Sequence, residues 1–308
     1  MFDVSGIGAY CLDYLSVVES YPSEDEKMEV NHIEIQGGGN VATALVAVGR
    51  LGGKACYQGI IGNDENTNSI LNGLKRENVD ISHIIVEEGK NPFAFIIINT
   101  KNNSRTILYT KSEVPLFKEE NIDVGVIQDS KVLLLDFYHE EASLAASRVA
   151  HGRSIPVVID AESIKPLSSE IMKNATHIVA SKSFALEFTG RSSNSVMEEV
   201  LKRFSEKVSC PFVCITLGGQ GAIGLESQTG RTYFQEAFPV EVVDTTGAGD
   251  VFHGAFSFFL SRDYSMDAIL RYASGCAALA CREIGGRKGI PTMNELMEFL
   301  KDRQPRIV

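Results

Sequence analysis

Short apolar runs alternate with amphipathic segments along most of the chain. The apolar runs, which are typical of buried strands, occupy residues 4–9, 55–61, 132–135, 157–159, 177–180 and 212–217. Between most of these runs, apolar residues recur with helical spacing at 41–51, 69–76, 140–151 and 195–208. Apolar strands that alternate with helices form a parallel sheet covered on both faces. We therefore predict an α/β fold whose ligands bind at the carboxyl ends of the strands.

Two segments break this alternation and predict a small accessory sheet. Short β patterns lie within the segments 14–36 and 93–112, at 15–18, 28–30, 33–35, 93–99 and 105–109. The polar residues 101–104 are typical of a tight turn between the last two strands. The alternating apolar positions of these strands need a surface to pack on. We expect a lid of four strands that covers a ligand, pairs with a second copy of the chain, or does both.

The length and the composition are those of one globular domain. The chain has 308 residues, of which 44% are hydrophobic, so residues 1–308 can form one domain with a full core. Its 29 basic and 40 acidic side chains give a net charge of −11, which argues against nucleic acids and anionic membranes as partners. We see no targeting segment and no apolar run of membrane-spanning length, so we expect a cytoplasmic location. The six cysteines form no C-x-x-C pair, and we expect them to pack as small apolar residues.

A glycine-rich stretch in the C-terminal third of the chain carries the strongest chemical signal. The apolar run at 237–243 precedes it and a helical pattern follows it, which predicts a turn from a strand into a helix. Gly247, Ala248 and Gly249 would leave backbone N–H groups uncovered at the start of that helix, where the helix dipole favours anions. The carboxylate of Asp250 would repel an anion, so its presence needs a second reason. We infer that Asp250 accepts the proton of an attacking hydroxyl while the N–H groups hold charge that develops on a transferred phosphoryl group.

Two further stretches carry groups suited to a small ligand with hydroxyl groups. Residues 37–39 are glycines, which allow close approach of the backbone, and Asn40 offers both a donor and an acceptor. Asp13 follows the first predicted strand, where the lid begins, and its carboxylate could accept hydrogen bonds from two neighbouring hydroxyls of a sugar. Taken alone, Asp13 is equally well explained as a turn-forming residue.

These stretches resemble the two signatures of the ribokinase-like (PfkB) carbohydrate kinases, and the resemblance extends over essentially the whole chain. It implies a three-layer α/β/α sandwich with a mostly parallel sheet and a small β lid. In that family, the aspartate that matches Asp250 is the catalytic base. The N–H groups that match those of Gly247, Ala248 and Gly249 form its anion hole.

The first signature implies which residues hold the sugar. In the family, the diglycine and the polar residues near it bind sugar hydroxyls. The residues of this chain assigned to the sugar are Gly38, Gly39, Asn40 and Thr43 from the resemblance, and Asp13 from the chemistry given above. Many members have asparagine where this chain has Thr43, and this departure leaves the identity of the sugar open.

The resemblance also implies a nucleotide site. Residues 216–221 resemble the T-x-G-x-x-G nucleotide loop of the family, and the loop at 285–291 matches one that borders the adenine and, in ribokinase-type members, a monovalent cation such as K⁺. The nucleotide-binding residues implied are Ser181, Thr216, Gly218, Gly221, Gly247 and Gly249. Many relatives carry an N-x-x-E motif that organises magnesium, but this chain has Ser181 and Phe184 there. We expect Mg²⁺ with ATP because it neutralises the phosphates, and its protein ligands stay open.

Three other residues are candidates of a weaker kind. Arg105 lies in a run that looks like one in ketohexokinases and could reach a substrate or a bound anion, or it could be a solvated arginine at a strand edge. Asp136 follows the strand at 132–135, so it should face the cleft, where many relatives have an acidic residue that contacts the sugar. His253 lies in the helix predicted after Gly249, and we expect it to pack or to make local hydrogen bonds.

The first functional hypothesis is an ATP-dependent sugar kinase. It would transfer the γ-phosphoryl group to a hydroxyl of ribose, fructose or a related ketose or sugar acid, and we expect it to form a homodimer through the lid. A phosphofructokinase is an alternative that requires several basic residues in the cleft, and a nucleoside kinase is an alternative that requires aromatic residues for stacking. The alternative outside the enzymes is a sensor that binds a sugar or a nucleotide without catalysis. The intact Asp250 argues against that sensor.

Overall fold

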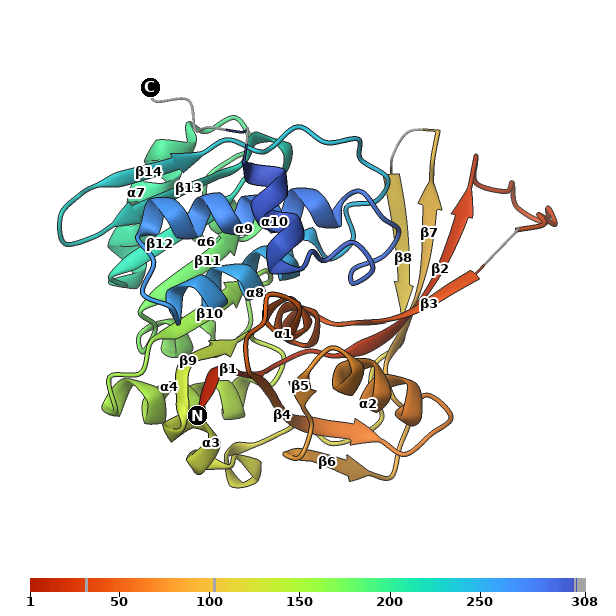
Figure 1. Ribbon diagram of the computed structural model, residues 1–308, viewed down its shortest axis with the longest axis horizontal. Coiled ribbons are helices and arrows are strands. Elements are labelled where there is room, and N and C mark those ends of the chain that lie inside the picture. The colour runs from red at the N-terminus through yellow and green to blue at the C-terminus, as the bar shows by residue number, and fades with distance from the viewer. Residues whose placement is uncertain (31–32, 102–103, 302, 304–308) are drawn as a thin grey trace.

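Two sheets organise the computed structural model, which describes residues 1–30, 33–101, 104–301 and 303 (Figure 1). Within these residues, the strands of the large sheet are β1 (Phe2–Ile7), β4 (Ala55–Gly62), β5 (Val79–Asp80), β6 (Ile84–Glu87), β9 (Ser130–Leu135), β10 (Val157–Ala161), β11 (His177–Ser181), β12 (Phe212–Thr216), β13 (Ala222–Glu226) and β14 (Thr232–Gln235). The small sheet consists of β2 (Cys11–Val18), β3 (Ile33–Gly38), β7 (Phe93–Asn99) and β8 (Ser104–Tyr109).

The large sheet is mostly parallel, as the apolar runs predict. Its order is β14-β13-β12-β11-β10-β9-β1-β4-β5, and β6 pairs with β4. The strands from β12 to β5 and β6 pair in parallel, whereas β13 and β14 add an antiparallel edge. The carboxyl ends of the parallel strands therefore meet at one edge of the sheet, where ligands of such folds bind.

Helices cover both faces of the large sheet and complete three layers. One face carries α1 (Asn40–Arg50), α2 (Thr67–Arg76), α8 (Ala248–Leu260), α9 (Met266–Ala280) and α10 (Met293–Leu300). The other carries α3 (Val124–Gln128), α4 (Glu140–Gly152), α5 (Ser168–Met172), α6 (Lys182–Thr189) and α7 (Met197–Val208). Successive strand residues serve opposite faces: Val132 and Leu134 join the first core, and Leu133 and Leu135 join the second. The predicted three-layer α/β/α sandwich is confirmed.

The small sheet projects from the large one as a lid (Figure 1). Its order is β3-β2-β7-β8, with β2 parallel to β7 and with antiparallel pairs at both sides. The predicted hairpin of β7 and β8 is present, with Asn99 opposite Ser104, whereas residues 102 and 103 of its predicted turn lie outside the described residues. One face of the lid buries the side chains of Leu15, Ile96 and Ile98.

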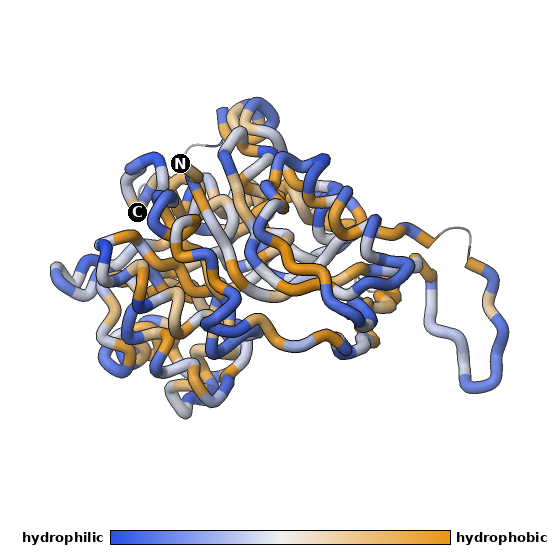
Figure 2. The backbone as a smooth tube through the Cα atoms, turned by 90° about the horizontal axis from the view of Figure 1, so that it is seen from below, coloured by the Kyte–Doolittle hydropathy of each residue, from blue (hydrophilic) through white to orange (hydrophobic). Residues whose placement is uncertain are grey.

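Two of the predicted strands are wrong. Residues 28–30 belong to an exposed, mainly hydrophilic loop that projects at the lid end of the molecule (Figure 2), where acidic side chains disfavour a strand. Residues 237–243 form a loop that meets the C-terminal end of α9, where Val243 N–H donates to the Cys281 carbonyl. Pro239 removes a donor from this segment, which suits a loop better than a strand. The glycine-rich turn is therefore entered from a loop and not from a strand.

Helices α1 and α8 cross with their backbones in close contact. A Cβ atom at Gly254 would lie 2.1 Å from the carbonyl oxygen of Ala44, so only glycine fits at the crossing. The N-terminal ends of both helices lie near the carboxyl edge of the sheet, because Asn40 of α1 and His253 of α8 both contact Asp160 of β10. In the described part of the chain, we find no helix with the length and apolar character needed to cross a bilayer.

Candidate active site

Polar side chains follow the neighbouring strands of the large sheet at their carboxyl ends. Asp136 follows β9, and Asp160 and Glu162 lie at the end of β10. Ser181 ends β11 and is paired with Thr216, which ends β12. The predicted binding edge is thus lined by carboxylates at its centre and by hydroxyl groups toward β12.

The glycine-rich turn begins α8 at this edge. Gly247 caps the helix with φ of 71°, a left-handed conformation, and a Cβ atom there would lie 2.6 Å from the Cα atom of Gly286. At Gly249 a Cβ atom would meet nothing within 4 Å among the described residues, so the backbone of the turn is open on that side. The first N–H groups of a helix have no partner within the helix. Among the described residues, Ala248 N–H donates to the Thr245 carbonyl (3.3 Å), whereas the N–H groups of Gly247 and Gly249 have no backbone partner. The turn therefore presents free N–H groups at a helix N-terminus that suits an anion.

The side chain of Asp244 fixes the turn through three hydrogen bonds. Its Oδ1 atom accepts hydrogen bonds from the N–H (3.0 Å) and the hydroxyl (2.8 Å) of Thr246, and its Oδ2 atom accepts one from Gly285 N–H (2.9 Å). Asp244 is buried. The turn and the loop at 285–291 are consequently fixed to each other through one carboxylate.

Asp250 lies half-buried in the first turn of α8, next to the open backbone. Burial raises the pKa of Asp250 well above its ordinary value, and the negative charges of Asp160 and Glu162 raise that pKa further. A carboxylate with a raised pKa is a stronger proton acceptor than an ordinary one. The site therefore places a basic carboxylate directly after a turn whose backbone suits an anion.

His253 connects this helix to the sheet. Its Nδ1 atom lies 2.6 Å from the carbonyl oxygen of Gly249, and its Nε2 atom lies 3.1 Å from that of Val179 and 3.4 Å from a carboxylate oxygen of Asp160. The side chain is buried. The prediction of local hydrogen bonding for His253 is confirmed, and its contacts connect the first turn of α8 to β10 and β11.

Asp13 and Gly38 lie against each other where the lid joins the main domain. The thiol of Cys11 donates a hydrogen bond to Asp13 Oδ1 (3.0 Å), and burial raises the pKa of Asp13. A Cβ atom at Gly38 would lie 2.2 Å from Asp13 Oδ2, so glycine leaves room for that carboxylate. Gly39 has φ of 87° and is the N-cap of α1. These residues, predicted from separate motifs, form one surface.

Asn40 connects α1 to the carboxylates of β10. Its Nδ2 atom donates hydrogen bonds to Asp160 Oδ2 (3.2 Å) and to Glu162 Oε2 (2.9 Å). The predicted amide therefore lies at the carboxyl edge of the sheet, and its donor atom faces the acidic end of β10.

A buried arginine lies behind the sugar residues predicted from the first signature. Arg287 is 7% exposed and donates hydrogen bonds to the Gly38 carbonyl (3.0 Å) and to Thr43 Oγ1 (3.4 Å). A Cβ atom at Gly37 would lie 2.1 Å from Arg287 Nη1, so the glycine run leaves space for the guanidinium. Thr43 is buried and lies behind this guanidinium. The positive charge of Arg287 offsets the nearby carboxylates of the site, Asp13 among them.

Arg105 joins the lid to the glycine-rich turn. This exposed residue of β8 donates a hydrogen bond from Nη1 to the hydroxyl of Thr245. The strand register puts Arg105 and Asp13 on the same face of the lid, because β2 pairs with β7 and β7 with β8. That face is therefore turned toward the site.

Asp136 connects the segments that follow β1 and β9. It is buried, its Oδ2 atom accepts from Ala9 N–H (2.7 Å), and its Oδ1 atom accepts from Tyr138 N–H (2.8 Å). Burial raises the pKa of Asp136 to about 7. Both oxygens are engaged by the backbone, so a contact to a sugar would use their remaining lone pairs.

Four of the six residues predicted for the nucleotide lie at the β11 and β12 ends of the edge, and the other two, Gly247 and Gly249, lie in the turn before α8 described above. Ser181 caps α6 by accepting a hydrogen bond from Phe184 N–H (3.1 Å), and Thr216 donates to the Ala180 carbonyl (3.4 Å). The tight turn after β12 contains Gly218 and Gly221, with φ of 58° and 100°. A tight turn and a nucleotide loop are both compatible with this geometry.

The sequence analysis missed three residues of the site: Asp160, Glu162 and Arg287. Asp160 lies at the end of an apolar strand, so the rule that selected Asp136 could also have selected Asp160 and, two residues later, Glu162. Arg287 gave no comparable signal, because its partners lie far away in the sequence.

Comparison with known proteins agrees with this geometry. The model of the family described as "pfkB family carbohydrate kinase" matches residues 1–293 of this chain. A ribokinase of Bacillus subtilis is 28% identical over 97% of this chain and 100% of its own, and a 5-dehydro-2-deoxygluconokinase of Shouchella clausii is 24% identical over 98% and 96%. The structure of Arabidopsis thaliana ribokinase complexed with ribose and ATP superposes with a TM-score of 0.85, at 19% identity over 97% of this chain and 99% of that one.

The fold and its strand-end site define a kinase with a β lid. Within that class, the chain belongs to the pfkB family of carbohydrate kinases. Binding of ATP follows from membership of the family.

Proposed function

We propose that this protein transfers the γ-phosphoryl group of ATP to a hydroxyl group of a monosaccharide, which is ribose, fructose or a related ketose or sugar acid. The observation that carries the proposal is the arrangement at α8, where the carboxylate of Asp250, with its raised pKa, follows an uncovered helix N-terminus. Sugar kinases among the relatives, which include a ribokinase and a 5-dehydro-2-deoxygluconokinase, support this class of acceptor.

In the proposed reaction, the acceptor hydroxyl lies between Asp13 and Asp250. Asp250 takes the hydroxyl proton as the sugar oxygen bonds to the γ-phosphorus, and the bond to the bridging oxygen breaks so that ADP leaves. The N–H groups from Gly247 to Gly249 stabilise charge on the phosphoryl oxygens. The lid, which reaches the turn through the hydrogen bond from Arg105 to Thr245, keeps water from competing as the acceptor.

The carboxylates at the end of β10 are suited to the magnesium ion that accompanies ATP in this family. Mg²⁺ prefers oxygen ligands, and Asp160 and the exposed Glu162 offer carboxylate oxygens beside the turn. They would take the place of the absent N-x-x-E motif, and the ion would neutralise phosphate charge when bound. Activation by a monovalent cation such as K⁺ beside the loop at 285–291 stays a prediction from the resemblance.

A coupled assay of ADP release tests the proposed function. The purified protein is supplied with ATP, Mg²⁺ and, in turn, ribose, fructose, sulfofructose, 2-keto-3-deoxygluconate, fructose 1-phosphate or adenosine. Turnover with an unphosphorylated sugar or sugar acid supports the proposal. A preference for fructose 1-phosphate or adenosine would favour the phosphofructokinase or the nucleoside kinase, and sugar binding by calorimetry without any turnover would favour the sensor.

Replacing Asp13 by alanine is expected to raise the KM for the sugar by about 10- to 100-fold, because hydrogen bonds to a charged group are each worth about 1.5–3 kcal/mol. The KM for ATP should stay close to that of the wild type. Steady-state kinetics with each substrate varied in turn measures the split. Asp25→Asn, at an exposed aspartate of the loop after β2, is the matched control. Equal effects on both KM values would show that Asp13 does not contact the sugar.

Replacing Glu162 by glutamine is expected to shift the acid limb of the kcat/KM profile to lower pH. Protonated Asp250 cannot accept a proton, so activity falls as the pH drops through its pKa. Burial raises that pKa most, and the charges of Asp160 and Glu162 raise it further, so removing one charge lowers it. The variant should also need more Mg²⁺ for half-maximal rate. Profiles measured at saturating Mg²⁺ separate the two effects, and an unchanged acid limb would contradict the electrostatic coupling.

We also propose a homodimer formed through the outer face of the lid. The register aligns Ile35, Tyr14, Phe95 and Leu108 in one row across its four strands, on the face opposite Asp13 and Arg105. Leu108 is 61% exposed, and exposed apolar faces of this kind support association. The proposal makes the lid both a cover and an interface.

Sedimentation equilibrium should give twice the 33.6 kDa mass of the chain. Leu108→Lys is expected to yield the monomer because a buried charge opposes association. Val86→Lys, at a comparably exposed apolar residue of β6 outside the lid, should stay dimeric. A wild-type monomer, or a dimer that persists in Leu108→Lys, would exclude this interface.

A further inference from the structure

A second group of chemically reactive side chains lies away from the active site, near the amino end of β4. Cys56 is the second residue of β4, Asp80 ends β5, and His83 directly precedes β6. The active-site edge is at the other end of β4, and the residues from Cys56 to Gly62 span roughly 20 Å of strand. The group is therefore remote from the ATP and sugar sites.

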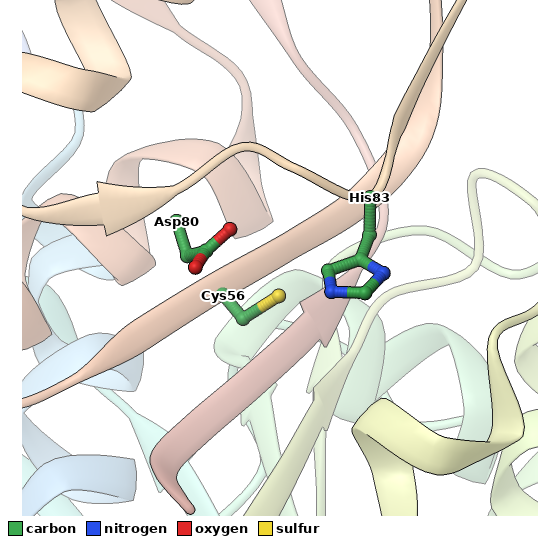
Figure 3. A group of neighbouring side chains, drawn as sticks. All are labelled: Cys56, Asp80 and His83. Carbon is green, nitrogen blue, oxygen red and sulfur yellow. The ribbon is translucent and has the colours of Figure 1, made fainter.

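The three side chains point toward one another (Figure 3). The Cys56 sulfur, a carboxylate oxygen of Asp80 and a ring nitrogen of His83 all lie within 4.8 Å of one another. Cys56 is buried, His83 is half-buried and Asp80 is exposed, so the group is open to solvent on one side. No local spacing connects Cys56 to the other two residues, and the sequence analysis consequently treated the cysteines as packing residues.

Neighbouring groups hold two of these side chains in orientations that favour a ligand. The carboxylate of Asp123 lies 3.1 Å from His83 Nδ1, which directs Nε2 to serve another partner. Histidine ligands of metals are commonly oriented by such a carboxylate on the second ring nitrogen. Ser82 donates two hydrogen bonds, from its N–H and its hydroxyl, to Oδ1 of Asp80, which leaves Oδ2 for another interaction.

We propose that Cys56, Asp80 and His83 form a zinc site with water as the fourth ligand. Thiolate, imidazole and carboxylate are the three ligand types of protein-bound Zn²⁺, and a sulfur ligand disfavours Mg²⁺ and Ca²⁺. Ligand atoms around a tetrahedral zinc ion are separated by about 3.3–3.8 Å. From the 4.8 Å limit given above, the three ligand atoms reach that spacing by closing at most about 1.0–1.5 Å.

The bound ion would have a structural role, because it would cross-link separate elements of the fold. It would join β4 to the connection between β5 and β6. The contact between His83 and Asp123, the N-cap residue of α3, would connect the ion to that helix. It touches no residue of the proposed phosphoryl transfer, so the two proposals stand or fall separately.

Titration with Co²⁺, a spectroscopic substitute for zinc, tests the site in the full-length protein after removal of metal by a chelator. One equivalent should produce the near-ultraviolet absorption of a thiolate–cobalt bond, and Zn²⁺ should displace it because thiolate ligands favour zinc. Cys56→Ser should lose this absorption. Cys281→Ser, at a cysteine outside the group, should keep it.

Affinity measurements on the other two residues and on Asp123 complete the test. His83→Ala should bind Co²⁺ at least tenfold more weakly, whereas His151→Ala, at an exposed histidine of α4, should bind it normally. Asp123→Asn should lose about 10- to 100-fold, as expected for a carboxylate that orients a ligand. Kinase activity of His83→Ala should stay unchanged.

Two results would overturn the zinc site. One is a wild-type protein that gives no thiolate absorption with Co²⁺, and the other is absorption that survives in Cys56→Ser. If Cys56→Ser fails to fold, unchanged Co²⁺ affinity in both Asp80→Asn and His83→Ala, which alter more exposed positions, would overturn it equally.

Discussion

Replacing Asp250 by asparagine is expected to lower kcat by about 10²- to 10⁴-fold, the usual contribution of a general base. Asparagine has nearly the same shape but cannot accept the hydroxyl proton. The KM for ATP should be unchanged or lower, because the variant removes a negative charge from beside the phosphates. Steady-state and single-turnover kinetics measure these effects.

Asp267→Asn is the matched control for this experiment. Asp267 also lies in the first turn of a helix, α9, where its exposed carboxylate pairs with Arg231. The control variant should keep wild-type activity, and melting curves should show that Asp250→Asn is folded. An Asp250→Asn variant with wild-type kcat would exclude the assignment of this residue as the base.

Replacing Gly249 by alanine is expected to reduce kcat/KM for ATP by roughly 100-fold without loss of stability. A Cβ atom at this position meets nothing within 4 Å among the described residues, and alanine favours a helix by up to about 1 kcal/mol over glycine. The added methyl group would instead occupy the open side of the turn, where the phosphoryl group should lie. Misplacement by about 1 Å is enough for such a loss of rate.

Two other glycines make this result interpretable. Gly247→Ala should lose both stability and activity, because φ of 71° and the 2.6 Å approach to Gly286 leave no room for a side chain. Gly152→Ala, at the open C-terminal end of α4, should change neither by much. Thermal melts and initial rates distinguish the three variants. A Gly249→Ala enzyme with normal kcat/KM would mean that the phosphates bind elsewhere.

The sequence predicts the central strands well because parallel strands are buried on both faces. The run at 132–135 is apolar throughout, since Leu133 faces one core and Leu134 the other. The run at 237–243 is also partly apolar, but it meets the C-terminal end of α9 and contains Pro239, which disfavours a strand. The strand prediction there is wrong for that reason.

Contacts between distant segments limit what the sequence can predict about the site. Asp13 and Gly38 come from separate motifs, and their direct contact follows from the pairing of β2 with β3. The hydrogen bonds of Asn40 to the acidic end of β10 join residues more than a hundred positions apart, and no local pattern announces them. The burial of Arg287 could not be predicted from the sequence either, because lysine and arginine usually lie at the surface.

In the proposed reaction, the crossing of α1 and α8 at Gly254 sets the distance between the acceptor and the donor. Main chain touches main chain there, so the separation between the start of α1, where the proposed acceptor binds, and the start of α8, where the proposed donor binds, does not depend on the side chains around the sugar. In the proposed reaction, the residues around the sugar can therefore change while the distance over which the phosphoryl group is transferred stays constant. Adapting this chain to a new sugar would require changes in the residues around the sugar and none at the crossing of α1 and α8.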